Sequence, residues 1–185
     1  LALASLVGAH GVALLVSRVA AQPLRLADGA AALDLSPQQR EVAVLIAQGH
    51  TVTGLDNLCD AYDVRLKQAN LDFLSLYAAS CKIYKGDICD VDFMGDIFEN
   101  ERPTHICHLA ARAGVRPSIV DPYIYVHSNV EGTTRLLDLA RRFSVKNFVY
   151  ASSSSVYGCS TNEILSESDA VEKPVSPYAA TKKAW

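Results

Sequence analysis

The sequence has few cysteines, no C-x-x-C pair and no basic stripe, and these absences exclude several classes of protein. Its five cysteines are scattered through 185 residues, which is typical of reduced thiols in a cytosol-like compartment rather than of a disulfide framework. A formal net charge of −3 gives no support for nucleic-acid binding. In a strand, His105 and Cys107 would face one way and His108 the other, so this pattern predicts strand packing and no metal site.

Charged residues are absent from the first part of the chain, residues 1–17, which is rich in Ala, Leu and Val. The run is slightly short for a membrane span and contains Gly8, His10 and Gly11. We expect a cytoplasmic protein; a signal-peptide core or a Golgi membrane anchor is the alternative, so a membrane partner is left open. Because the chain starts at Leu1 and its one Met is Met94, we expect a fragment or a processed product.

From Ser36 onward, strand patterns alternate with helix patterns. Such alternation predicts an α/β fold, an incomplete Rossmann-like doubly wound parallel sheet with helices on both faces. Ligands in such folds collect at the carboxyl ends of the strands. The predicted strands cover 50–55, 83–88, 105–109 and 147–150, and the predicted helices cover 36–49, 63–79, 91–100 and 129–143. The residues that end these strands are Asp56, Asp87, Ala110, Ala111 and the serines 152–155.

The last part of the chain carries a pattern typical of acid/base catalysis. Tyr178 and Lys182 are four residues apart in a predicted helix, so both project from one face. A nearby ammonium favours the phenolate form of Tyr178, and a serine of the 152–155 run could share its proton. Taken alone, the Tyr–Lys pair could be a surface pair, and the serine run could be a solvated loop.

Together these motifs resemble the extended short-chain dehydrogenase/reductase family, the NAD-dependent nucleotide-sugar epimerases and dehydratases. The resemblance extends over about residues 41–184. Its most detailed part is to the UDP-glucuronate 4-epimerases. It rests on D-N-x-x-D-x-Y-D from Asp56, H-L-A-A-R-A-G-V-R from His108, the Ser-Ser-Val-Tyr-Gly turn and S-P-Y-A-A-T-K-K from Ser176. It implies that Tyr178 is the catalytic base, that Lys182 is its partner and a ribose ligand, and that Ser153 is the third catalytic residue.

The resemblance also implies NAD as cofactor and a UDP-sugar as substrate. A carboxylate at Asp56 would accept bonds from the adenosine ribose and oppose the 2′-phosphate of NADP; alternatively, Asp56 is a helix cap or turn residue. The substrate candidates are Ser153, Ser154 and Arg116. The expected cofactor-binding residues are Asp56, Asn57, Asp87, Ile88, Leu109, Ala110, Ala111, Asn129, Tyr178 and Lys182.

The implied reaction is epimerisation of a UDP-sugar at C4, from UDP-glucuronate to UDP-galacturonate through a transient 4-keto sugar, by an enzyme that is a homodimer. A 4,6-dehydratase is the alternative within the family, although Ser154-Ser155 stand where that chemistry commonly has Asp-Glu.

The family's G-x-x-G-x-x-G loop is missing, because its glycines should fall near Ala32, Leu35 and Gln38. We therefore divide the chain into an atypical segment, 1–40, and a truncated NAD-binding domain, 41–185. An inactive remnant remains a further alternative for this chain.

Overall fold

The computed structural model describes residues 13–18, 49–60, 63–75, 79–160 and 164–185. The predicted helix over 36–49 and the expected glycine-loop positions lie outside these residues. The elements are β1 (Ala13–Arg18), β2 (His50–Asp56), α2 (Val64–Ser75), β3 (Cys81–Lys85), α3 (Val91–Glu101), β4 (His105–His108), α4 (Val115–Val120), α5 (Pro122–Tyr125), the π-helix η1 (Val126–Glu131), α6 (Gly132–Arg142), β5 (Asn147–Tyr150), the 3-10 helix η2 (Ser154–Tyr157) and α7 (Pro177–Lys183).

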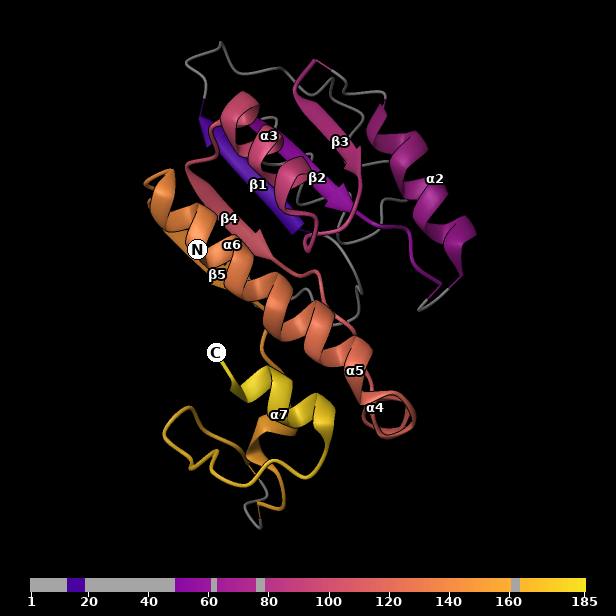
Figure 1. Cartoon of the computed structure of the whole chain (residues 1–185), viewed down its shortest axis with the longest axis vertical. Coiled ribbons are helices and arrows are strands. Elements are labelled where there is room, and N and C mark those ends of the chain that lie inside the picture. Colours follow the sequence, from indigo (N-terminus) through magenta and orange to yellow (C-terminus); the bar gives the residue numbers. More distant parts are fainter. Residues whose placement is uncertain (1–12, 19–48, 61–62, 76–78, 161–163) are drawn as a thin grey trace.

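The described strands form one sheet with the order β3-β2-β1-β4-β5 (Figure 1). β2 pairs with β3 and β4 with β5 in parallel, which confirms the predicted α/β fold for these strands. β1, from the segment to which no family role is assigned, lies at the centre of the sheet and is antiparallel to both neighbours. The predicted strands thus pair in parallel, and the antiparallel β1 is a strand that the sequence did not predict.

The direction of β1 matters for ligand binding. Ala13 pairs with Leu55 and His108, so β1 begins at the carboxyl ends of its neighbours and ends, at Arg18 opposite His50, at their amino ends. In a Rossmann fold the phosphate loop follows the first strand at the carboxyl edge. Gly8 and Gly11 have the G-x-x-G spacing of part of that loop. They precede β1 in the chain and lie outside the described residues.

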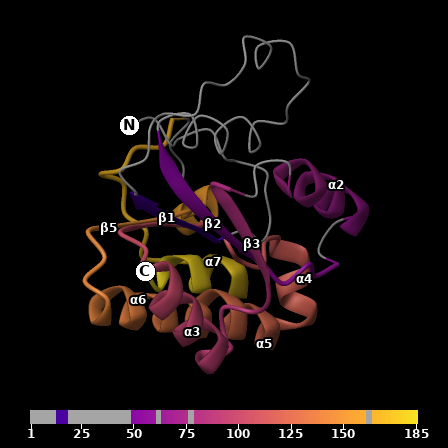
Figure 2. The same ribbon diagram turned by 90° about the horizontal axis from the view of Figure 1, so that it is seen from above.

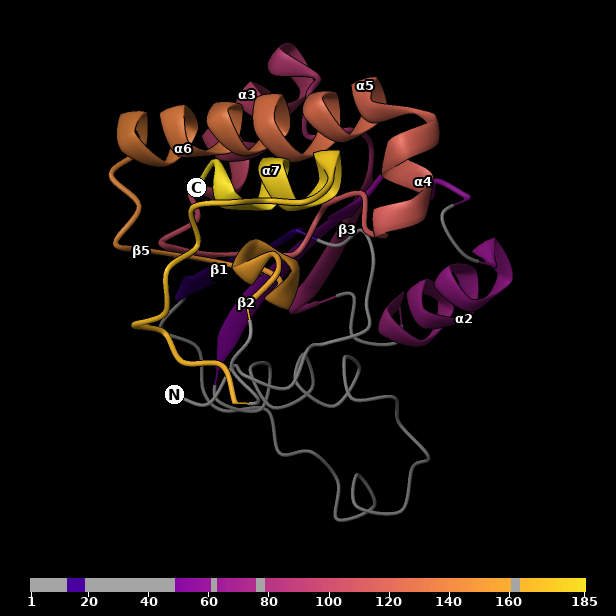
Figure 3. The same cartoon turned by 90° about the horizontal axis from the view of Figure 1, so that it is seen from below.

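Helices lie on both sides of the sheet. α3 and α6 cover one face (Figure 2), and α2 lies on the other side, next to β3 (Figure 3). The core under α3 and α6 consists of Leu55, Ile88, Met94, Ile97, Phe98, Ile106, Leu136, Leu139 and Ala140. Asp90 precedes α3 as its N-cap residue, and its carboxylate accepts from the Phe93 backbone N–H. These apolar contacts hold the carboxyl ends of β2, β3 and β4 in place.

One helix differs from the sequence prediction in what it buries. The apolar residues of the predicted helix 63–79 make Leu66 a candidate core residue, but Leu66 is 60% exposed, whereas its neighbour Lys67 is 2% exposed. Leu66 is exposed because α2 contacts the sheet mainly beside the edge strand β3.

Among the described residues, none of the helices combines the length and the apolar character needed to cross a bilayer. The last residues of the uncharged N-terminal run form β1, and residues 1–12 lie outside the described part of the chain.

Candidate active site

A pocket lies where β2, β3 and β4 end. With the adjoining solvent it encloses about 380 Å³. Its walls come from the ends of the three strands and from η1, a position typical of ligand sites in doubly wound folds. The lining residues are Leu55, Asp56, Asn57, Cys59, Gly86, Asp87, Ile88, Ala110, Ala111, Arg112 and Ser128. Most of the predicted cofactor-binding residues are thus brought together from distant parts of the chain.

Asp56 ends β2 and is held by two donors. Its Oδ1 accepts from the Leu58 backbone N–H at 2.7 Å and from Lys67 Nζ at 3.0 Å. The bond from the Leu58 N–H stabilises a turn, which is the alternative role predicted for Asp56. The same carboxylate also lines the pocket. Lys67 approaches from α2 and is as buried as its partner. A buried cation beside this carboxylate offsets the cost of removing Asp56 from water.

Asp87 and Asn57 link the ends of β3 and β2. Asn57 Nδ2 donates to Asp87 Oδ2 at 3.0 Å, and Asp87 Oδ1 accepts from the Cys89 backbone N–H at 2.9 Å. Burial alone would raise the pKa of Asp87, but these donors outweigh it and hold the pKa below its usual value. Asp87 therefore carries a negative charge at the pocket wall at neutral pH.

Two predicted cofactor residues, Leu109 and Asn129, do not line the pocket, and their cofactor roles stay predictions. Leu109 is buried and is not among the pocket-lining residues. Asn129 is 3% exposed; its Oδ1 accepts from the Arg112 N–H at 2.7 Å, and its Nδ2 donates to the Arg112 carbonyl at 2.9 Å and to Thr181 Oγ1 at 3.0 Å. Asn129 lies in the π-helical turn η1, a departure from α-helix that is frequent at functional sites. It joins the loop after β4 to α7.

A second polar chain runs beside Asn129. Thr133 Oγ1 donates to the Asn129 carbonyl at 2.6 Å and lies 2.9 Å from His108 Nε2. Because the Thr133 proton is already used, His108 must donate from Nε2. Burial, together with the charge of Lys182, lowers the pKa of His108 to about 3. His108 is thus a neutral structural residue that packs edge-on against Phe148, as the strand interpretation of this histidine predicts.

Tyr178 stands in the first turn of α7. Ser176 caps this helix by accepting from the Ala179 N–H at 3.1 Å, and Pro177 occupies the first turn. The Tyr178 N–H donates to Ser118 Oγ at 3.1 Å, and the Tyr178 ring, 9% exposed, packs edge-on against Tyr125. These contacts fix the direction of the phenol by joining α7 to α4 and α5.

Lys182 and Ser153 make their hydrogen bonds with the segment after β5 rather than with Tyr178. Lys182 Nζ donates to the Ala151 carbonyl at 2.8 Å, and burial lowers its pKa to about 8. Ser153 Oγ lies 3.2 Å from both the Oγ and the N of Ser155. Among the described residues no hydrogen bond joins Ser153, Tyr178 and Lys182 to one another, so their catalytic roles stay predictions.

Comparison with known proteins places the chain in a family. The family model described as GDP-mannose 4,6 dehydratase matches residues 41–185, which is most of the chain. The chain belongs to this family of NAD-dependent epimerases and dehydratases. The match includes every residue that lines the pocket.

Members of this family with known names and structures support the assignment. A UDP-glucuronate 4-epimerase of Thermodesulfobacterium geofontis is 45% identical over 139 residues, 75% of this chain and 42% of that protein. The NAD complex of Brucella ovis UDP-glucose 4-epimerase matches with a TM-score of 0.66 at 29% identity, over 79% of this chain and 41% of that one. The Streptomyces venezuelae dTDP-glucose 4,6-dehydratase DesIV matches with a TM-score of 0.61 at 31% identity, over 70% and 38%. The chain thus spans less than half the length of these family members.

Besides Ser153, the predicted substrate-binding residues are Ser154 and Arg116, and both are exposed. Ser154 opens η2 and Arg116 lies in α4. Neither residue lines the pocket, so their assignment to the sugar carboxylate stays a prediction.

Two residues that position this site, Lys67 and Ser118, have no predicted role in the sequence. The burial of Lys67 against Asp56 is found only in the structure. Ser118 lies in a short helix without a clear apolar period; it is fully buried and donates to the Val115 carbonyl at 2.6 Å. No local signal in the sequence could have identified either role.

Proposed function

We propose that the complete protein is an NAD-dependent epimerase that acts on C4 of a UDP-sugar and interconverts UDP-glucuronate and UDP-galacturonate. The observation that carries the proposal is the pocket in which Asp56, Asn57, Asp87, Ile88 and the small residues after β4 converge. The 45% identity to a named UDP-glucuronate 4-epimerase supports this choice of substrate.

The residues of the pocket suit the adenosine half of NAD. Asp56 would accept from ribose hydroxyls and Asp87 from the adenine amino group, while Ile88 supplies an apolar contact. Ala110 and Ala111 leave room for close approach of a ligand to the backbone after β4. The positions expected for the pyrophosphate loop lie outside the described residues.

Bound NAD would supply a hydride acceptor that oxidises C4 of the sugar and then returns the hydride to the opposite face. In the proposed mechanism Tyr178, as phenolate, removes the O4 proton, and Ser153 relays it. Lys182 stays largely protonated at neutral pH, because its lowered pKa of about 8 is still above 7. Its ammonium would stabilise the phenolate and bind the nicotinamide ribose. The 4-keto sugar would have to turn over in the site before C4 regains a hydride and O4 regains its proton.

A homodimer is part of the same proposal. Exposed apolar side chains lie along α4, α5 and the start of η1: Ile119, Val120, Tyr123 and Val126 are 65%, 87%, 83% and 50% exposed. Such a run is a candidate for an interface with a second copy. Sedimentation of the parent and of Val120→Asp would test it, since a dimer that uses this surface should dissociate in the variant.

The second candidate function is 4,6-dehydration. The family model and the structural match to a dTDP-glucose 4,6-dehydratase favour it. Against it, Ser154 and Ser155 supply hydroxyls where a dehydratase needs an additional acid and base.

The deciding experiment uses a chimaera in which this chain's residues 41–185 replace the matching part of the Thermodesulfobacterium geofontis relative. Incubation with UDP-glucuronate and separation of the products should yield UDP-galacturonate. A 6-deoxy-4-keto product from a dTDP- or GDP-hexose would support the dehydratase instead. A folded chimaera that converts none of these sugars would favour the inactive remnant.

A further inference from the structure

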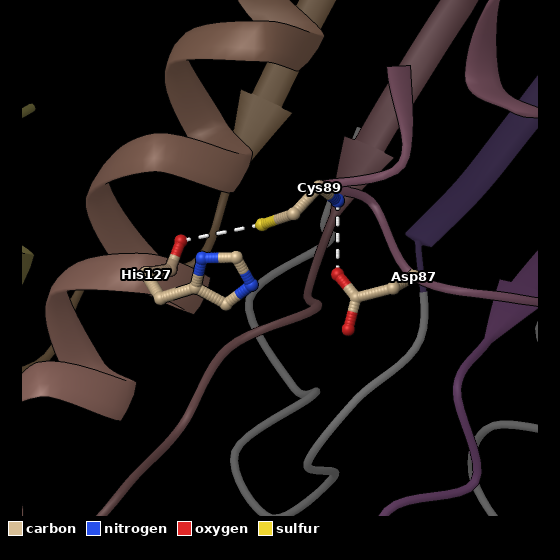
Figure 4. A group of neighbouring side chains, drawn as sticks. All are labelled: Asp87, Cys89 and His127. Carbon is tan, nitrogen blue, oxygen red and sulfur yellow. Dashed lines mark hydrogen bonds between the residues drawn. The ribbon is translucent and has the colours of Figure 1, made fainter. Parts of the chain in front are cut away.

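Three side chains with metal-binding donors meet beside the pocket, although the sequence analysis predicts no metal site. Asp87, Cys89 and His127 each direct one ligand atom into a shared space, and these atoms all lie within 4.8 Å of one another (Figure 4). Asp87 and Cys89 follow β3, whereas His127 belongs to η1, 38 residues further on. Only the fold brings them together. Cys89 and His127 have no role in the proposed epimerase chemistry.

The histidine is oriented for such a role. His127 Nδ1 lies 2.8 Å from Glu131 Oε2, one helical turn away. In Figure 4 the other ring nitrogen faces Asp87. Metal-bound histidines commonly bond a carboxylate through the second ring nitrogen, which fixes the tautomer and the ring orientation. Glu131 is itself held by Arg135, whose Nη2 lies 2.6 Å from Glu131 Oε1.

The other two ligands are also positioned. Asp87 is held by the Cys89 N–H and by the Asn57 amide. Cys89 Sγ lies 3.3 Å from the His127 carbonyl oxygen, so the thiol already points toward η1. Around a tetrahedral zinc ion, ligand atoms at about 2.0–2.3 Å from the metal are roughly 3–4 Å from one another. The separations of up to 4.8 Å must contract by about 1 Å to reach that geometry.

We propose that Asp87, Cys89 and His127 form a binding site for Zn²⁺, with Glu131 as the residue that orients His127. Binding replaces the S–H bond of Cys89 by an S–Zn bond and releases the proton to solvent. The resulting thiolate, the imidazole and the carboxylate are donors that Zn²⁺ accepts, and three protein ligands leave a fourth position for water. Because His127 is exposed, an ion can enter from solvent.

The site has a consequence for the pocket. Asp87 is shared, so a bound ion would take the carboxylate that the adenine amino group is proposed to use. Zinc and nucleotide would then weaken each other's binding by the same factor. This consequence rests on the proposed function, whereas binding of the ion by itself does not.

Zinc titration of the 185-residue chain, free of nucleotide, tests the site by calorimetry. We expect one ion per chain with a dissociation constant below roughly 10 µM. Glu131→Gln should weaken binding by about 10–100-fold, and Cys89→Ser and His127→Gln should weaken it at least as much. Cys159→Ser and His105→Gln, which change exposed residues outside the cluster, are the matched controls and should bind zinc like the parent.

Substitution with Co²⁺ gives a second readout that depends on the thiolate. The parent should show a sulfur-to-cobalt charge-transfer band that Cys89→Ser lacks and Cys159→Ser keeps. Because His127→Gln changes an exposed side chain, this variant should retain the circular dichroism of the parent. Parent-like zinc affinity in both Cys89→Ser and His127→Gln would overturn the proposal, as would a parent chain without stoichiometric binding.

Discussion

Lys67 Nζ lies 3.0 Å from Asp56 Oδ1, and the two side chains are only 1% and 5% exposed. The pair joins α2 to the end of β2 at the pocket. It is the most buried of the ion pairs found among the described residues. Since a carboxylate without its partner is costly in such surroundings, the pair couples the stability of α2 to the proposed ribose site.

Replacing Lys67 by Met should therefore destabilise the protein by about 3–5 kcal/mol, because Asp56 would remain buried without its cation. Urea unfolding of parent and variant measures the difference. Lys82→Met is the matched control: Lys82 pairs with Glu101 but is 57% exposed, so its loss should cost no more than about 1 kcal/mol. Equal losses in the two variants would contradict the importance given to the buried pair.

His108 should make stability depend on pH below neutrality. In the folded chain the pKa of His108 is lowered to about 3 from an ordinary value of 6.5. Between these two pH values the unfolded chain binds a proton at His108 and the folded chain does not. Stability is therefore lost as the pH falls from 6.5 toward 3, by up to about 1.4 kcal/mol per pH unit.

The comparison with His108→Gln isolates this contribution, because the variant keeps the other titrating groups. Its free energy of unfolding should fall less steeply than that of the parent over the same pH window. His105→Gln, which changes the exposed histidine of the same strand, should follow the parent. Parallel curves for parent and His108→Gln would contradict the neutral, buried state of His108.

Tyr178→Phe should remove nearly all turnover in the chimaera, since acid/base groups contribute about 10²–10⁴-fold, while NAD stays bound. Product formation from UDP-glucuronate and a separate NAD titration measure the two effects. Tyr123→Phe changes a phenol that is 83% exposed and serves as control. A Tyr178→Phe enzyme with turnover close to that of the parent would eliminate Tyr178 as the base.

The chimaera should bind NAD more tightly than NADP, because Asp56 opposes a 2′-phosphate. Asp56→Asn is the sharper test than Asp56→Ala, since it keeps an acceptor for Lys67 and for the Leu58 N–H. Fluorescence titration of both cofactors should show a smaller difference between them in the variant. Tighter binding of NADP by the parent chimaera would contradict the role of Asp56.

The 185-residue chain itself should bind NAD more weakly than roughly 10 µM, or about −7 kcal/mol. No glycine triad is present at Ala32, Leu35 and Gln38, and β1 runs away from the carboxyl edge that holds the pocket. A pyrophosphate needs backbone donors at a tight turn on that edge. Calorimetry with NAD measures this, and tighter binding would show that another segment supplies the phosphate loop.

The sequence alone determined the elements whose pattern is local. Strand β2 and helix α3 begin where predicted and end within a residue of the prediction, because side-chain alternation and capping residues act over a few positions. The order of strands then placed Asp56, Asp87 and Ala110 at one edge, since parallel strands end together. The burial of Leu109 and the hydrogen bonds of Asn129 could not be read from the sequence, because they depend on contacts between distant segments.

Only the tertiary structure decided what depends on contacts between distant segments. An uncharged run can pair in either direction, so the antiparallel course of β1 follows from its neighbours and not from its own residues. Lys67 is buried, and Leu66 exposed, because of how α2 meets the edge of the sheet. Asp87, Cys89 and His127 share a space because η1 lies beside the loop that follows β3. Burial and proximity are properties of the folded chain as a whole, and they determine the charge of Asp87, the neutrality of His108 and the proposed zinc site.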